Sequence, residues 1–402
     1  MKKKILFLSY NDFSGGAAIA TYNMFRSISK KKYNLELYCV KKLINSSNVK
    51  NIKISIFSYF RILISIILSQ FLFVIFRSKQ KVKRSMCIFK TGLLKSIDLD
   101  DVDIVHFHWL YNEVVSIDEI LKIKKKTIIS LHDLWFCNGS FHYNPGNLNY
   151  FTNLFEKFLL KRKCSKILDS KNTVFTTPSL WCKNQFLNTL NNNNPNNRKL
   201  PKVFIIKNVV NFRNFKIKNK LKKLNSIPKS EFVLLFHYEK NNDYVKGYDH
   251  LFRLLKILNK KMTYKYLIIF GNNTKKFPYE KFENLIFYDF GFVDNEKIDR
   301  VYKQSDALIL TSRQETFSQL TADCLRYKTP VVAFNCSGHK ELINHKKNGY
   351  LVDDFSINQM LKGIDFFKKK SFINNNGLRD CYLKNYYTKN LKQIYETENF
   401  DT

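Results

Sequence analysis

Acidic residues are scarce in this sequence. Its 402 residues include 33 Asp and Glu but 68 Lys and Arg, which gives a formal net charge of +35. Such a charge is compatible with a nucleic-acid partner, with an anionic membrane surface, or with compositional drift, since Lys, Asn, Ile, Phe and Tyr are all abundant. The sequence contains no signature of a nucleic-acid-binding fold and no interleaving of aromatic and basic residues like that of RNA-binding modules. We therefore favour drift with a membrane contribution, and we expect no nucleic-acid partner.

Closely spaced cysteines and a secretion signal are also missing. None of the eight cysteines forms a C-x-x-C pair. The basic N-terminus MKKKILFLSYND leads into a short strand-like segment without a small-residue cleavage site. We therefore expect a cytoplasmic protein with reduced, mostly buried thiols rather than disulfides or a zinc site.

One long apolar segment interrupts the N-terminal half. Residues 54–76 approach the length of about 20 residues that spans a bilayer, but Arg61, Gln70 and four serines lie within them and basic residues flank both ends. Three interpretations stay open: an interfacial helix on an anionic membrane, one or two core helices, or a transmembrane helix. The basic flanks favour the interfacial helix. We therefore expect a peripheral protein on the inner face of the cytoplasmic membrane.

The most informative stretch is SDALILTSRQETFSQLTADCLRYKTPVVAFNCSGHKELI, at residues 305–343. SDALILTS and PVVAF have the apolar, β-branched pattern of buried parallel strands, and a helical pattern begins near Ser318 between them. Glu315 lies in the loop before this helix, and Asp323 lies inside it. Open α/β sheets bind ligands outside the carboxyl ends of their strands, and a helix N-terminus offers N–H groups to an anion. The pattern therefore predicts a ligand site at Glu315.

Two other strand ends supply candidate site residues. Gly15 and Gly16 separate a first strand from a helix, where a glycine pair lets a ligand approach the backbone closely; an ordinary tight turn is the alternative. Histidines gather where two further strands end, and these are His106, His108, His132 and the later His142. Histidines can bind a metal, but neither a further ligand nor a supporting carboxylate is readable around them. We therefore expect no metal centre.

These features resemble the retaining, nucleotide-sugar-dependent glycosyltransferases of the GT-B fold, of the large bacterial type usually numbered four and also called glycosyl transferases group 1. In that family a Glu, seven residues and a second Glu precede a "GTPVVA"-like strand, and here Glu315, seven residues and Asp323 precede KTPVVAF. The resemblance implies that Glu315 touches the donor sugar and that the shorter carboxylate of Asp323 holds the ribose hydroxyls. It also places the start of the helix against the donor, at Thr316, Phe317 and Ser318.

The resemblance extends to the other candidates. Lys240 and Lys246 have the spacing of a pair of family cations that clamps the donor diphosphate, and Gly15–Gly16 match a glycine pair that lies against it. The motif HDLW followed by HY resembles a subgroup of the family, in which the histidine at this strand end contacts the reacting sugar. That role carries over to His132. The implied catalytic residues are His132, Glu315 and Lys246.

The implied architecture is α/β, a GT-B fold with two Rossmann-like domains facing across a central cleft. An acceptor-binding domain is expected at residues 1–211, a nucleotide-sugar-binding domain at residues 231–380, and a helix crossing back to the N-domain within residues 381–402.

The implied reaction moves a sugar from a nucleoside diphosphate sugar to a glycan or lipid-linked saccharide acceptor with retention, as in the biosynthesis of bacterial surface polysaccharide or lipopolysaccharide. We expect a hexosyltransferase that needs no divalent metal and no other cofactor. Two alternatives stay open: a sugar-nucleotide 2-epimerase of the same fold, and a non-catalytic basic protein that binds membranes or nucleic acid.

Overall fold

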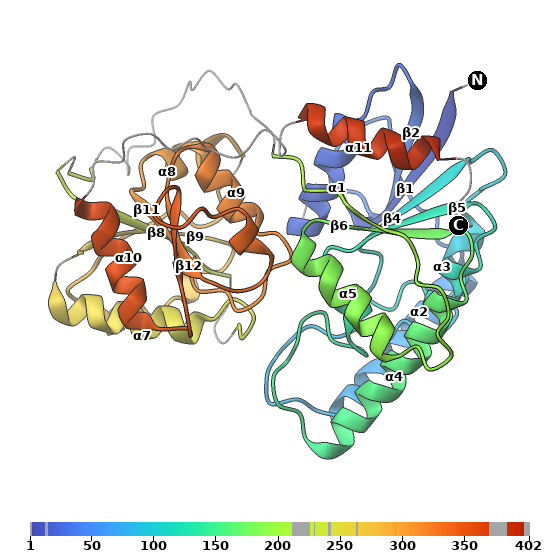
Figure 1. Cartoon of the computed structure of the whole chain (residues 1–402), viewed down its shortest axis with the longest axis horizontal. Coiled ribbons are helices and arrows are strands. Elements are labelled where there is room, and N and C mark those ends of the chain that lie inside the picture. Colours follow the sequence, from blue (N-terminus) through green and yellow to red (C-terminus); the bar gives the residue numbers. More distant parts are fainter. Residues whose placement is uncertain are drawn as a thin grey trace. The chain divides into compact units, whose positions relative to one another are not determined.

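The computed structural model of the chain describes residues 2–12, 15–210, 226–228, 230–239, 243–262, 264–293, 295–369 and 384–397. The chain divides into two compact units (Figure 1). Unit 1 contains Met1–Val209 and Cys381–Thr402, and unit 2 contains Val210–Asp380. Each unit has a parallel sheet with helices, so the predicted two-part α/β fold is confirmed.

Unit 1 is built on a seven-stranded sheet in the order β3-β2-β1-β4-β5-β6-β7, in which every pair of neighbours is parallel. Its strands are β1 (Lys3–Asn11), β2 (Tyr33–Lys41), β3 (Val49–Asn51), β4 (Ile104–His108), β5 (Lys126–Ser130), β6 (Thr173–Thr177) and β7 (Val203–Ile205). Its helices are α1 (Gly16–Ser27), α2 (Ile56–Ile75), α3 (Ile117–Leu121), α4 (Tyr150–Leu168), α5 (Leu180–Asn192) and α11 (Lys384–Glu396).

Unit 2 repeats this plan with a six-stranded parallel sheet in the order β10-β9-β8-β11-β12-β13. Its strands are β8 (Val233–His237), β9 (Tyr266–Phe270), β10 (Ile286–Asp289), β11 (Ala307–Leu310), β12 (Val331–Phe334) and β13 (Gly349–Val352). Its helices are α7 (Tyr248–Lys261), α8 (Asn295–Lys303), α9 (Gln319–Arg326) and α10 (Ile357–Lys369). Short 3₁₀ turns lie at Leu93–Ser96, Trp135–Cys137, Thr274–Lys276, Tyr279–Lys281 and Gly338–Glu341.

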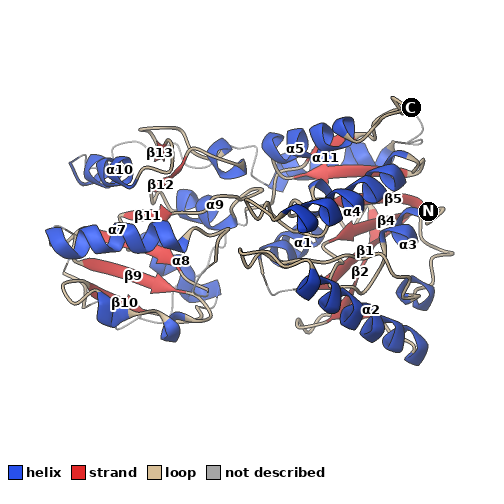
Figure 2. Ribbon diagram, turned by 90° about the horizontal axis from the view of Figure 1, so that it is seen from below, coloured by secondary structure: helices blue, strands red, loops and turns tan. Residues whose placement is uncertain are grey.

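Both sheets bury their central strands on both faces, which is why these strands read as continuous apolar runs. In β1, Leu6 and Leu8 belong to one core cluster, while the alternating Ile5 and Phe7 belong to a second cluster on the other face. Helices cover both faces of each sheet (Figure 2). In each unit the strand order reverses beside the first strand, between β1 and β4 and between β8 and β11. Ligands bind at such switch points, outside the carboxyl ends of the strands.

Helix α11 packs on unit 1 although it follows unit 2 in the sequence. Leu391, Ile394 and Tyr395 join the core cluster that contains Ile5 and Phe7. The Tyr395 hydroxyl also lies 3.0 Å from Nδ1 of the buried His106. The last described helix of the chain is therefore part of the N-terminal unit.

Residues 54–76 contain a single helix, α2 (Ile56–Ile75), rather than two. Ser55 caps its N-terminus by accepting from the backbone N–H of Ser58. The helix is long and apolar enough to cross a membrane, yet only 22% of its most apolar window is buried. It is therefore not an ordinary core helix of unit 1.

Candidate active site

Two loops of unit 2 bring a lysine and a carboxylate together. Lys246 precedes α7 in the loop after β8, and Glu315 precedes α9 in the loop after β11. The Lys246 Nζ lies 2.8 Å from Glu315 Oε1, and the side chains are 37% and 10% exposed. Because β8 and β11 are neighbours at the switch point of the sheet, the pair lies where an α/β sheet binds its ligand.

Further contacts hold the Glu315 carboxylate in its charged form. The Ser312 hydroxyl donates to the same oxygen over 2.9 Å. Burial alone would raise the pKa of Glu315, but the Lys246 ammonium and these hydrogen bonds lower it overall. Burial alone would likewise lower the pKa of Lys246, whereas Glu315 raises it. Both groups are therefore charged at neutral pH.

The loop after β12 fixes the backbone of Glu315. Its N–H donates to Ser337 Oγ over 3.0 Å, and its carbonyl accepts from the Gly338 N–H over 2.7 Å. The buried His339 lies 2.7 Å from the Phe334 carbonyl through Nε2 and 3.1 Å from Ser337 Oγ through Nδ1. A carbonyl only accepts, so His339 is protonated on Nε2 and accepts at Nδ1. Three loops that follow neighbouring strands thus converge on Glu315.

Gly247 lets the loops of Lys246 and Glu315 approach closely. Its φ is +64°, and a Cβ at this position would lie 2.0 Å from the Thr311 carbonyl oxygen. Arg313 joins the same loops through two bonds to the Asp249 carboxylate, of 2.7 and 2.6 Å. Any larger residue at 247 would separate the loops that carry Lys246 and Glu315.

Helix α9 carries the second predicted carboxylate. Asp323 is partly buried and accepts from Gln319 Nε2 over 3.2 Å. Ser318 caps the helix with φ +72°, and Thr316 and Phe317 are buried just before it. The N-terminus of α9 and Glu315 therefore share one loop. Lys240 lies outside the described residues.

In unit 1 the predicted glycine pair lies at the start of α1. Gly15 has φ +89° and caps the helix, and no atom of the described residues lies within 4 Å of the position that a Cβ would take at Gly15 or Gly16. Gly15 is required by its backbone conformation, whereas Gly16 is compatible with a close ligand but not required by the fold.

The predicted histidines form a stack at the ends of β4 and β5. His108 Nδ1 lies 2.9 Å from His132 Nε2, so one ring donates to the other and fixes its orientation. His108 Nε2 is buried and has no hydrogen-bond partner among the described residues. Burial lowers the pKa of His132 to about 4 and that of His106 to about 3. These imidazoles are therefore neutral at physiological pH.

His142 is turned away from this stack. Its Nδ1 pairs with Asp133 over 2.6 Å, and the same carboxylate oxygen accepts from Trp109 Nε1 over 2.6 Å. The described residues contain no group of three or more His, Cys, Asp or Glu side chains that could hold a metal ion. Burial also lowers the pKa of His142. The four histidines are thus split between a stack of three and a hydrogen bond from His142 to Asp133, and metal independence stays a prediction.

The residues that sequence reasoning missed are supports rather than ligand contacts. Ser312, Ser337 and His339 hold Glu315. His108 was noticed in the sequence as a possible metal ligand, and what the sequence missed is that it orients His132. Each of them lies at or just after the carboxyl end of a parallel strand. That shared placement was the available signal, but a single sequence does not say which side chain of a loop faces inward.

Comparison with known proteins gives these loops a context. Residues 218–381 match the model of the family Glycosyl transferases group 1. The resemblance is confirmed for this segment. It contains Lys246, Glu315 and Asp323.

An uncharacterized glycosyltransferase of Haemophilus influenzae is 32% identical over 155 residues, which are 37% of this chain and 41% of that protein. The chain thus spans less than half the length of this relative.

Solved glycosyltransferase structures cover nearly the whole chain. HepE of Anabaena, in complex with UDP-glucose, has 15% identity and a TM-score of 0.64 and covers 98% of each chain. WaaG, a glycosyltransferase involved in lipopolysaccharide biosynthesis, has 13% identity and a TM-score of 0.54 over 99% of this chain and 96% of its own. At these identities the likeness shows the fold, which is GT-B.

Proposed function

We propose that this chain is a metal-independent, retaining glycosyltransferase that moves a hexose from a nucleoside diphosphate sugar to a glycan or lipid-linked acceptor. The observation that carries the proposal is the Lys246–Glu315 pair at the switch point of unit 2. It lies in the segment that matches the glycosyltransferase family. The UDP-glucose named for HepE supports a nucleotide-sugar donor. The pathway named for WaaG supports a role in surface polysaccharide or lipopolysaccharide biosynthesis.

The reaction breaks the bond between the anomeric carbon and the diphosphate and forms a bond from that carbon to an acceptor hydroxyl, whose proton is released. The protein must stabilise the charge that develops on the leaving diphosphate. The Lys246 ammonium and the N-terminus of α9 supply that charge stabilisation in our proposal, with Lys240 as a further cation. Glu315 accepts from hydroxyls of the donor sugar, and Asp323 accepts from the ribose.

His132 acts on the sugar from unit 1 in this proposal. It is neutral, and His108 holds its ring. A neutral imidazole can accept from one hydroxyl or donate to another without bringing a charge to the reaction centre. No described atom crowds Gly15 or Gly16, which leaves room for the donor to approach the backbone at the start of α1.

We also propose that the protein works as a peripheral protein on the inner face of the cytoplasmic membrane. The exposed apolar face of α2 supports this, together with the basic residues that flank the helix. The test is to wash membranes of expressing cells in high salt or carbonate and to follow the protein. Release supports a peripheral protein, and retention through both washes contradicts it in favour of a span.

The donor is tested first by thermal stabilisation, because a ligand that binds only the folded state raises its apparent stability. A panel of uridine and guanosine diphosphate sugars should contain one that raises the Tm of the wild type and raises that of Glu315→Gln less. Product analysis with this donor alone then separates the two enzymes of this fold. Conversion to an epimer without acceptor would contradict the transferase and establish the 2-epimerase.

A further inference from the structure

Helix α2 buries polar residues and exposes apolar ones, the reverse of an ordinary surface helix. Its buried residues are Ser58, Ile62, Ser65 and Ser69, so the face toward unit 1 is mostly serine. The outward face carries large apolar side chains, and Phe57 is 76% exposed. The other exposed apolar residues of the helix are Ile56, Tyr59, Phe60, Leu63, Ile64, Ile67, Leu68, Phe71, Val74 and Ile75. A continuous apolar face of this kind marks an interaction surface.

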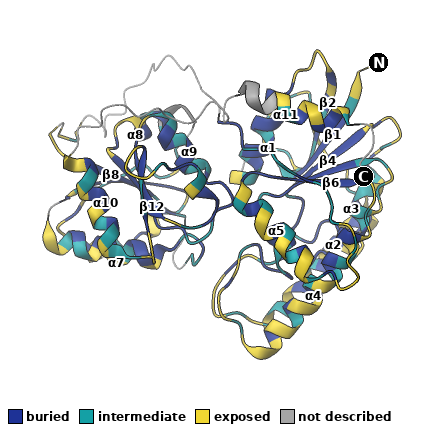
Figure 3. Cartoon of the chain, viewed as in Figure 1, coloured by how far each residue is buried: buried dark blue, intermediate teal, exposed yellow. Residues whose placement is uncertain are grey.

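The first turns of α4 show the same exposure. Tyr150, Phe151, Leu154 and Phe158 are exposed, Phe151 by 72%. Leu154 and Phe158 are four residues apart and share one side of the helix. Figure 3 shows exposed residues gathered at this end of α4. The sequence of α4 does not predict an apolar surface, because one would expect its charged residues to be exposed. Instead Glu156 and Lys163 are buried.

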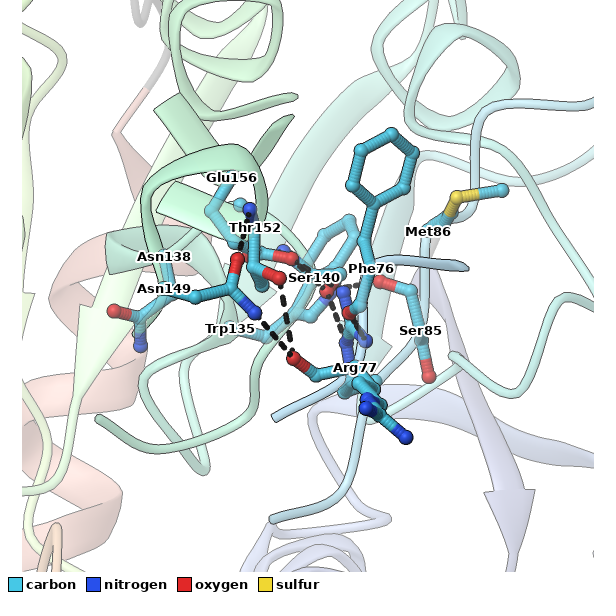
Figure 4. Close-up of polar contacts among 12 residues, drawn as sticks. Phe76, Arg77, Ser85, Met86, Trp135, Asn138, Ser140, Asn149, Thr152 and Glu156 are labelled. Atoms are coloured by element: carbon cyan, nitrogen blue, oxygen red, sulfur yellow. Dashed lines mark hydrogen bonds and ion pairs between the residues drawn. The ribbon is translucent and has the colours of Figure 1, made fainter. Parts of the chain in front are cut away.

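Polar contacts join the end of α2 to the start of α4. The Arg77 carbonyl, just after α2, accepts from Thr152 Oγ1 over 3.1 Å and from Asn149 Nδ2 over 3.4 Å (Figure 4). The rings of Phe76 and Phe155 stack with centroids 4.2 Å apart.

A buried ion pair completes this junction. Arg84 donates to the Phe76 carbonyl over 2.6 Å and pairs with Glu156 over 2.8 Å, with both side chains 8% exposed. Breaking a buried pair is costly, so it fixes the geometry of the two helices.

Charge identifies what can cover this surface. No acidic residue occurs between Glu36 and Asp98, and the acidic residue of α4 is Glu156, which is paired with Arg84. Basic side chains are exposed around the apolar residues, namely Lys53, Arg61, Arg77, Lys79, Lys81, Lys157 and Lys161. An apolar face bordered by these cations complements an anionic bilayer. A second copy of the same face would meet like charges.

The inner face of α2 is tied to unit 1. Ser65 Oγ lies 3.4 Å from Glu113 Oε2, and the Glu113 carboxylate accepts from the backbone N–H groups of Met86 and Cys87, over 2.5 and 2.8 Å. A helix that crossed a bilayer would lose the contact between Ser65 and Glu113. The helix therefore presents its outer face while it stays on the domain.

We propose that α2 and residues 150–158 of α4 form one lipid-facing surface, the α2/α4 surface, which binds anionic bilayers with α2 lying in the plane of the interface. This inference rests on the membrane association proposed above and adds a second helix to it. Because these contacts join the end of α2 to the start of α4, we expect both helices to enter the same leaflet together.

Two tryptophan reporters test the insertion. Phe151→Trp on α4 and Ile67→Trp on α2 are mixed with phosphatidylcholine vesicles, with and without phosphatidylglycerol, that carry brominated acyl chains. Both reporters should be quenched on the anionic vesicles. The matched control is Met262→Trp, at an exposed position of unit 2, which should not be quenched.

Flotation with vesicles measures how much the exposed apolar side chains contribute to binding, when they are replaced by serine. Phe151→Ser/Phe158→Ser should weaken binding to anionic vesicles at least tenfold, as should Phe57→Ser/Phe71→Ser, while Met262→Ser binds like the wild type. Thermal unfolding establishes that each variant is folded.

The outcomes distinguish the two-helix surface from membrane association in general. Loss of binding and of quenching only for the α2 variants would overturn the two-helix surface and leave the membrane association standing. Absence of wild-type binding to anionic vesicles would overturn both, while the donor assay would still test the transferase. A dimer in sedimentation that the α4 variant converts to monomer would assign the surface to a second copy and contradict the proposal.

Discussion

The two units share one strand order but carry different chemistry at the carboxyl ends of their strands. In unit 2, Lys246 and Glu315 are charged and compensate each other across 2.8 Å. In unit 1, the imidazoles of His106, His108 and His132 are held neutral by burial, which lowers the pKa of each. A charged pair can exchange partners with a charged ligand, whereas a neutral stack suits hydroxyl groups. The difference fits the proposed division between a diphosphate site in unit 2 and a sugar and acceptor site in unit 1.

The largest effect is expected for Glu315→Gln. The amide offers one acceptor oxygen in place of two and removes the negative charge opposite Lys246, so transfer should fall on the order of 10²-fold while the fold survives. Turnover with the donor found by thermal stabilisation is the measurement, with the exposed Glu283→Gln as the matched control. Activity within a factor of about two of wild type would remove Glu315 from the site.

Gly247→Ala should destabilise unit 2 and weaken donor binding together. The new Cβ meets the Thr311 carbonyl at a positive φ, which we expect to lower the free energy of unfolding by about 2–3 kcal/mol. Gly16→Ala is the counterpart in unit 1, where no described atom lies within 4 Å of the added Cβ. It should leave the free energy of unfolding nearly unchanged. Equal effects of the two substitutions in chemical denaturation would contradict this contrast.

Lys246→Ala should weaken donor affinity and turnover by on the order of tenfold or more, because it leaves diphosphate charge uncompensated. Lys240→Ala should have the smaller effect. Donor titration and steady-state kinetics of the two variants test the order. The reverse order would assign the main diphosphate contact to Lys240.

Acid should destabilise the protein before its carboxylates titrate. His132 and His106 have folded pKa values of about 4 and about 3, below the ordinary value of 6.5. Their stabilising contribution is fully present above pH 6.5 and is lost as the pH falls toward these folded values, by up to a few kcal/mol. Denaturation between pH 7 and roughly pH 4 should show this slope, and His106→Gln should reduce it. An unchanged slope in the variant would show that folding does not lower the pKa of His106.

Chelation should have the smallest effect. We expect EDTA to leave transfer largely unchanged, since lysines and a helix N-terminus meet the diphosphate charge in our proposal. Rates measured after dialysis against EDTA test this. Abolished activity that manganese or magnesium restores would contradict the proposed charge compensation.

The architecture was readable from the sequence because parallel strands buried on both faces leave an unmistakable apolar pattern, as in KILFL of β1 and PVVAF at β12. Glu315 was readable because it follows such a strand, whereas Lys246 was identified through the resemblance to the family's pair of cations. The supports were not, since the bond from Ser337 to Glu315 joins residues of two different loops. The buried face of α2 was equally hidden. An ordinary helix would expose its serines and bury its isoleucines, whereas in α2 the serines face unit 1, where Ser65 lies beside the Glu113 carboxylate.

The central claim is that unit 2 binds the donor while unit 1 acts on the sugar, and calorimetric titration of the donor tests it most directly. UDP-glucose and GDP-mannose would be titrated into the wild type, Lys246→Ala and His132→Ala. The account predicts that one of these donors binds the wild type, binds His132→Ala with an affinity within about threefold, and binds Lys246→Ala at least tenfold more weakly. Equal affinity for the wild type and Lys246→Ala, with the loss confined to His132→Ala, would contradict it.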